Sequence, residues 1–190
     1  KAGAEFWPLS FARDFDDLIL HLRSNENETT TWVFKTEGNP DYVEMADNAL
    51  LDNEDNWLIK EIKLYLKRTF KRLDVSSRSI ITLVEPGSCF TGTLLELVLA
   101  ADRSYMLDGT FEGSNIAHAS LRATRMNFGD LTMCNGLSRL KTRFLDSDDE
   151  VIAIKSKIGE DFDAFAADEL GLVTFIPDDI DWEDEVRIAI

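Results

Sequence analysis

The chain has few of the residues that hold secreted or metal-binding proteins together. It contains two cysteines, Cys89 and Cys134, and two histidines, His21 and His118. A disulfide framework needs more cysteines, and the spacing between these cysteines and histidines matches no zinc-binding pattern. We therefore expect free thiols, no metal site and a cytoplasmic location.

Positive charge is also scarce. The sequence has 20 Lys and Arg residues and 36 Asp and Glu residues, which gives a net charge of −16. Such a surface repels phosphate backbones and anionic membranes unless a basic patch is set aside for them. No segment approaches the roughly 18 consecutive apolar residues of a membrane-spanning helix. The sequence therefore argues against a role in binding nucleic acid or membranes.

What remains is the composition of an ordinary globular protein, with 190 residues of which 44% are hydrophobic. This length suits one domain, which we expect to span residues 1–190. The abrupt start at Lys1 and the apolar end at Ile190 lead us to expect that the chain is part of a longer polypeptide.

Hydrophobic periodicity predicts alternating strands and helices. Apolar or β-branched runs predict strands, and an apolar stripe at helical spacing predicts helices. Strands separated by helices of this length pair in parallel through βαβ crossovers, so we expect an α/β fold. The predicted strands cover 31–35, 79–84, 102–107 and 171–176, and an irregular tract covers 108–138. The predicted helices cover 15–22, 57–73, 93–101, 151–158 and 163–170, and an acidic helix covers 178–185.

The stretch from Glu85 to Asp102 is the most informative for chemistry. A buried strand, a turn of small residues and an apolar helix follow one another directly. A helix start presents unpaired backbone N–H groups, which can hold a developing oxyanion. Glu96 lies one turn inside this helix among apolar residues, so we expect a raised pKa and a general acid or base. Alternatively, Gly92 merely permits close helix packing and Glu96 points to solvent.

A family resemblance bears on this choice. The segment Gly92–Leu97, followed by Asp102 six residues after Glu96, resembles the Gly-Gly-Gly-x-Glu-Leu segment of the crotonase (enoyl-CoA hydratase) superfamily. Within that superfamily, the chain resembles the second half of the benzoyl-CoA-dihydrodiol lyases, which are also called 2,3-epoxybenzoyl-CoA dihydrolases. The segments that carry this resemblance are 7–13, 31–38, 74–79, 85–90, 100–103 and 171–182.

The resemblance implies a crotonase-like fold, which is a spiral of βαβ units with a mainly parallel sheet. It also implies opening of the ring of 2,3-epoxybenzoyl-CoA in aerobic benzoate degradation, with CoA present only as part of the acyl-CoA substrate. Glu96 would be catalytic, and Gly92 with Thr93 would supply one backbone N–H of an oxyanion hole. The second N–H would come from the loop at Gly38. A homo-oligomer and an N-terminal crotonase half are the implied partners.

The chain departs from the crotonase pattern at a second position. Arg125 stands where these enzymes carry another catalytic glutamate, and Thr132 stands where proline is usual. A guanidinium stays protonated and cannot act as a base, so we expect Arg125 to bind substrate instead. Two functions therefore remain open for this chain. It is either a catalytic half of the lyase or a degenerate, non-catalytic module with a structural or oligomerisation role.

Overall fold

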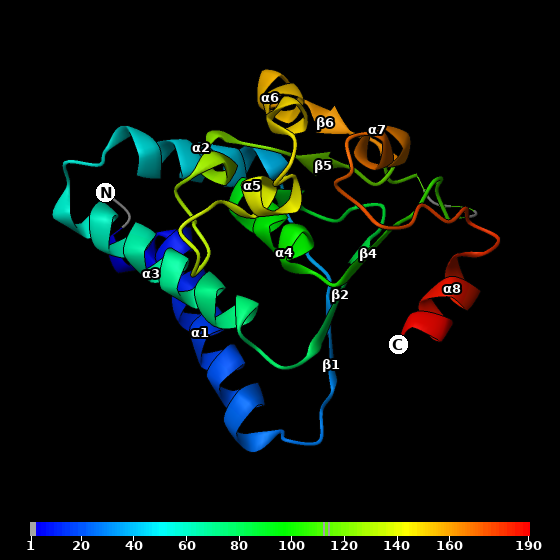
Figure 1. Cartoon of the computed structure of the whole chain (residues 1–190), viewed down its shortest axis with the longest axis horizontal. Coiled ribbons are helices and arrows are strands. Elements are labelled where there is room, and N and C mark those ends of the chain that lie inside the picture. The colour runs from blue at the N-terminus through cyan, green and yellow to red at the C-terminus, as the bar shows by residue number, and fades with distance from the viewer. Residues whose placement is uncertain (1–2, 112, 114) are drawn as a thin grey trace.

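The computed structural model describes residues 3–111, 113 and 115–190 (Figure 1). The helices are α1 (Trp7–Asn25), α2 (Pro40–Asp52), α3 (Trp57–Asp74), α4 (Leu95–Ala100), α5 (Arg139–Arg143), α6 (Asp148–Ser156), α7 (Ala164–Glu169) and α8 (Trp182–Ala189). The 3-10 helices are η1 (Gly3–Glu5), η2 (Gly92–Leu94) and η3 (Arg125–Phe128). The strands are β1 (Thr31–Phe34), β2 (Ser79–Val84), β3 (Phe90–Thr91), β4 (Arg103–Met106), β5 (Leu121–Arg122) and β6 (Asp161–Phe162).

The main sheet has the order β1-β2-β4, and both pairings are parallel. Trp32 lies opposite Ile80, and Leu83 lies opposite Tyr105. The connection from β1 to β2 runs through α2 and α3, and the connection from β2 to β4 runs through α4. The predicted parallel α/β arrangement, with these three strands as neighbours, is confirmed.

The two faces of this sheet are covered very differently. Ile80 and Val84 face the large core that is formed with α1, α3 and α4. Figure 1 shows α1 and α3 packed along each other beside this core. The alternate residues Ile81 and Leu83 face a smaller cluster that is closed by Trp182 of α8. Because side chains alternate across a strand, the nearly continuous apolar run of β2 serves both cores.

A second, smaller sheet joins the later part of the chain to the turn that precedes α4. In it, β3 pairs in parallel with β5, and β5 pairs antiparallel with β6. Arg122 of β5 binds Asp161 of β6 and also contacts Asp41 and Glu44 of α2, so the small sheet is tied to α2 by charge. The sequence predicted none of these short strands: β3 lies in the predicted turn before the apolar helix, β5 lies in the tract predicted to be irregular, and β6 lies between two predicted helices.

Helix α2 was not predicted, although its start carries a clear signal. Asn39 accepts a hydrogen bond from the Asp41 amide, and Pro40 occupies the first helical position. Both features are typical of helix starts. The loop that the sequence analysis placed at Gly38 therefore leads directly into a helix.

The strand predicted over 171–176 is wrong. Its backbone makes one isolated bridge, between Phe175 and Tyr105, and no named strand forms there. The Arg143 guanidinium occupies the carbonyl oxygens of Gly171 and Leu172, at 3.2 and 2.7 Å, so these groups are not available to a neighbouring strand. Leu172 and Val173 are buried and Phe175 is 43% exposed, but the segment stays irregular.

Among the described residues, no helix combines the length and the apolar character needed to cross a membrane.

Candidate functional site

A cleft of about 380 Å³ lies where β1 and β2 end. The carboxyl ends of parallel strands meet at one edge of a sheet, which is where α/β proteins commonly bind ligands. Its lining combines the loops that follow the two strands with Ile116 from the segment between β4 and β5. The residues of the two loops are Lys35, Thr36, Glu37, Glu85, Pro86, Gly87 and Ser88. A larger groove of about 500 Å³ lies between η1, α2 and α3, and its lining includes no residue that the sequence predicted for the site.

Gly38, the predicted second oxyanion donor, lies near this cleft. The Cys89 amide donates to the Thr36 hydroxyl at 3.1 Å, which ties the loop after β1 to the turn after β2. A Cβ atom on Gly38 would come within 3.5 Å of the Cys89 Cβ atom. The structure thus brings Gly38 beside the strand–turn–helix segment that the sequence singled out. Gly38 itself is exposed.

Glu85 stands between this cleft and helix α8. Its carboxylate accepts hydrogen bonds from Lys35 Nζ at 2.8 and 3.0 Å and from the Trp182 indole at 3.2 Å. The loop after β1, the end of β2 and α8 therefore meet at one carboxylate.

The predicted helix start at Gly92 has a different form from the one expected. Residues Gly92–Leu94 form a 3-10 turn, and the α-helix begins at Leu95. The Thr93 amide, the predicted oxyanion donor, donates to Asp47 Oδ2 at 2.9 Å. The Thr93 hydroxyl donates to Asp47 Oδ1 at 2.5 Å. The sequence analysis expected the Thr93 amide to bind a thioester oxygen. In the structure this amide instead binds the carboxylate of Asp47.

Asp47 has an unusual environment for a carboxylate. It belongs to α2, has 0% of its surface exposed, and also accepts a hydrogen bond from the Thr124 hydroxyl at 2.9 Å. Burial raises the pKa of Asp47 to about 6, and the hydrogen bonds from Thr93 and Thr124 oppose that rise. At neutral pH the group is mainly ionised, so the three donors surround a negative charge.

Glu96 is also buried, with 1% of its surface exposed. Its Oε1 accepts from the Asn127 side-chain amide at 2.7 Å, and its Oε2 accepts from Arg139 Nη1 at 2.7 Å. Burial raises the pKa of Glu96, while Arg139 and Asn127 oppose the rise. The raised direction predicted from the sequence is confirmed, and the reading in which Glu96 points to solvent is wrong. Both carboxylate oxygens, however, are bound by protein groups.

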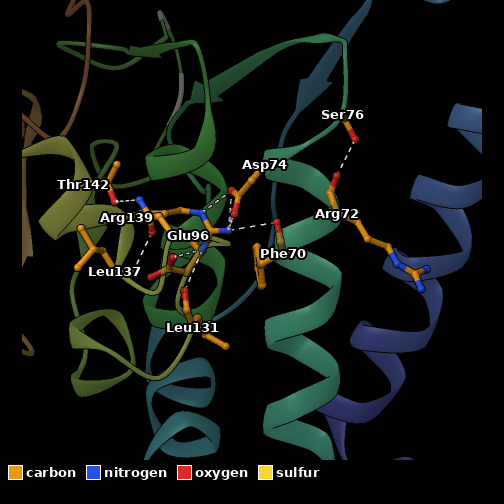
Figure 2. A network of polar contacts seen from close by, with 10 residues as sticks. Phe70, Arg72, Asp74, Ser76, Glu96, Leu131, Leu137, Arg139 and Thr142 are labelled. Carbon is orange, nitrogen blue, oxygen red and sulfur yellow. Dashed lines mark hydrogen bonds and ion pairs between the residues drawn. The ribbon is translucent and has the colours of Figure 1, made fainter.

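Arg139 organises the polar network around Glu96 (Figure 2). Its guanidinium bonds Asp74 at 2.7 and 2.8 Å through Nη2, and it also donates to the carbonyl oxygens of Phe70 and Leu131. Burial lowers the pKa of Arg139, but Glu96 and Asp74 raise it by more, so the guanidinium stays protonated. Helices α3, α4 and α5 are joined at this one side chain.

Asn127 connects the Glu96 network with the Asp47 network. Its side-chain amide donates both to Glu96 and to the Gly92 carbonyl oxygen at 2.8 Å, and its own oxygen accepts from the Thr124 amide. Reasoning from sequence missed Asp47, Asn127 and Arg139. Asp47 had a detectable signal, because it lies on the apolar face of a helix, but the other two had none.

Arg125, the predicted substrate-binding residue, lies at the surface. Its side chain is 54% exposed and its guanidinium pairs with Asp52 of α2 at 2.8 Å. Asp102 accepts a hydrogen bond from the Ile80 amide, which holds the start of β2. Within the described residues, no group of three or more His, Cys, Asp or Glu side chains is arranged to hold a metal ion.

Comparisons with known proteins place this geometry in context. No protein-family model matches the chain. The chain is 50% identical over 188 residues to the benzoyl-CoA-dihydrodiol lyase of Aromatoleum evansii. The aligned region covers 99% of this chain and 33% of that protein. The chain thus spans about a third of the length of the curated relative that it matches.

Solved structures show the same fold at low identity. The enoyl-CoA hydratase of Bacillus anthracis superimposes with a TM-score of 0.60 and 18% identity, over 95% of this chain and 64% of that one. The enoyl-CoA hydratase of Bacillus halodurans gives a TM-score of 0.61 and 15% identity, over 95% and 68%. The crotonase-like fold is therefore confirmed, as is the similarity to a benzoyl-CoA-dihydrodiol lyase.

Proposed function

We propose that this chain is the C-terminal crotonase-like part of a benzoyl-CoA-dihydrodiol lyase, and that within it this part is architectural rather than catalytic. The identity of 50% over nearly the whole chain supports the first statement. The full protein would open the ring of 2,3-epoxybenzoyl-CoA in the cytoplasm, with a further crotonase-like part and other subunits as partners.

The architectural role rests on one observation. Glu96, at the position of a crotonase glutamate, is 1% exposed, and both of its oxygens are bound by Asn127 and Arg139. A general acid or base must reach the proton that it transfers, directly or through one water. To do so here, Glu96 would have to leave a buried ion pair, and breaking such a pair leaves an uncompensated charge. The arrangement suits a structural contact between α4, α5 and η3.

Acyl-CoA binding without catalysis is a second candidate, which the cleft at the ends of β1 and β2 favours. Its lining offers Lys35, the exposed Gly38 lies nearby, and the cleft has the position that ligands take in α/β sheets. Titration of the full-length protein with benzoyl-CoA, compared with Lys35→Met, tests this candidate. Loss of affinity on substitution supports binding at the cleft, and equal affinities contradict it.

The test of the architectural role is turnover of the full-length lyase carrying Glu96→Gln. This substitution keeps the shape of the side chain and removes its acid–base function. We expect turnover within about threefold of wild type and a lower melting temperature, because the charge that pairs with Arg139 is lost. A catalytic Glu96 would instead lower turnover by about 10²–10⁴-fold with little change in substrate binding.

A matched control is Asp16→Asn. Asp16 is another buried carboxylate, which is paired with Arg72 at 2.7 Å. Comparison with the Asp16→Asn variant separates the general effect of losing a buried charge from an effect specific to Glu96. Turnover of a folded Glu96→Gln protein below a tenth of that of Asp16→Asn would show that this part of the enzyme is catalytic.

A further inference from the structure

The contacts of Asp47 form a closed anion-binding arrangement inside the protein. Three donors converge on one carboxylate: the Thr93 amide at 2.9 Å, the Thr93 hydroxyl at 2.5 Å and the Thr124 hydroxyl at 2.9 Å. They come from two segments, η2 and the start of η3, whereas the carboxylate comes from α2. Hydrogen bonds to an ionised acceptor are stronger than neutral ones, and burial strengthens them further.

Residues beside these donors also make contacts that do not involve Asp47. Thr124 caps η3, and its hydroxyl oxygen accepts from the Met126 amide, so its own proton is free to point at Asp47. Asn127 of η3 donates to the carbonyl oxygen of Gly92, which is the first residue of η2. The segment before Thr93 thus has an anchor at the Gly92 carbonyl oxygen that does not involve the Asp47 carboxylate.

The Asp47 carboxylate lies very close to the backbone of Gly92. The φ angle of Gly92 is +50°, and a Cβ atom at this position would overlap Asp47 Oδ2 and the Thr124 hydroxyl. A glycine is required at this position both for the backbone conformation and for the room that Asp47 takes. The glycine that the sequence linked to an oxyanion hole thus makes space for an anion belonging to the protein.

We infer that Asp47 is an internal anion that occupies the Thr93 amide and keeps this crotonase-like unit closed to an external thioester. This inference rests on the proposed architectural role, which the contact between Asp47 and the Thr93 amide would enforce. Without the carboxylate, the same three donors form a site for a small monocarboxylate such as formate, which has the size and charge of the missing group.

The experiment compares the thermal stability of the full-length protein carrying Asp47→Ala in sodium formate and in sodium chloride at equal ionic strength and pH 7. We expect Asp47→Ala to melt below wild type in chloride. In about 0.2 M formate its Tm should rise by about 3 °C more than that of wild type, since a ligand that binds only the folded state stabilises it by mass action. If the variant does not fold in chloride, refolding from urea in formate replaces the melt, and recovery of folded protein is expected.

Two control variants isolate the three donors. Leu50→Ala opens an apolar cavity one turn further along α2, where Leu50 is 0% exposed, and should gain nothing from formate. Asp47→Ala combined with Thr124→Val removes one donor and should lose most of the formate effect. Equal formate shifts in Asp47→Ala and Leu50→Ala, or no recovery on refolding in formate, would overturn the inference.

This result is separable from the test of the proposed function. If Glu96→Gln abolishes turnover while formate still stabilises Asp47→Ala, Asp47 is an internal anion in a catalytic unit. If turnover survives and formate has no specific effect, the unit is architectural for reasons other than Asp47.

Discussion

Replacement of Arg139 by methionine removes the guanidinium on which the buried polar network depends. Arg139 is 2% exposed, and the side chains of Glu96 and Asp74 with which it pairs are 1% and 5% exposed. Methionine has a similar length and fills most of the space, so the loss of packing is small. The dominant effect is that two carboxylates lose their cation.

The expected magnitude follows from the burial of these groups. Breaking a buried ion pair by removing one partner typically lowers stability by about 3–5 kcal/mol. The carbonyl oxygens of Phe70 and Leu131 lose a donor at the same time. We therefore expect Arg139→Met to lie at or above the upper end of that range. Glu96→Gln leaves Arg139 paired with Asp74, so its effect should be only about 1–2 kcal/mol.

Urea unfolding of four proteins at pH 7 measures these differences: wild type, Arg139→Met, Glu96→Gln and the double variant. Because Glu96→Gln removes one of the unpaired charges that Arg139→Met creates, the double variant should be less destabilised than the sum of the two, by about 1–3 kcal/mol. The ion-pair reasoning would be refuted if Glu96→Gln destabilised the protein more than Arg139→Met, or if the two effects were additive.

Three further predictions concern other buried groups. Burial raises the pKa of Asp47 from 3.8 to about 6, so its ionisation destabilises the folded state as pH rises through this range. Between pH 5 and pH 7, wild type should lose about 1 kcal/mol more unfolding free energy than Asp47→Asn, and equal slopes would contradict the shift. Gly92→Ala should melt well below wild type, because its Cβ would overlap Asp47, and a neutral substitution would show that α2 can move. Cys134 is exposed and should react at once with a thiol reagent under native conditions. Cys89 is buried, burial raises the pKa of its thiol, and it should react only as the protein unfolds, which a time course of labelling checks.

The sequence determined the parts of this protein that depend on local pattern. The run Ile80–Val84 is nearly continuously apolar, which predicted a strand buried on both faces, and it lies in β2 with a core on each side. Glu96 lies among apolar residues in a short helix, which predicted a raised pKa but left solvent exposure open, and the structure decided for burial. Resemblance to known sequences added the crotonase-like fold, which the long irregular motifs carried.

Only the tertiary structure decided what the buried carboxylates contact. Glu96 is 43 positions from Arg139, and Thr93 is 46 positions from Asp47, so no periodicity along the chain connects them. The pattern of a helix start predicts free N–H groups at Thr93, but whether they face a cavity or another side chain depends on how α2 packs against η2. In this protein the Asp47 side chain accepts the hydrogen bond from the Thr93 amide. A site of this kind is formed by the packing of distant segments, and local sequence describes only one side of it.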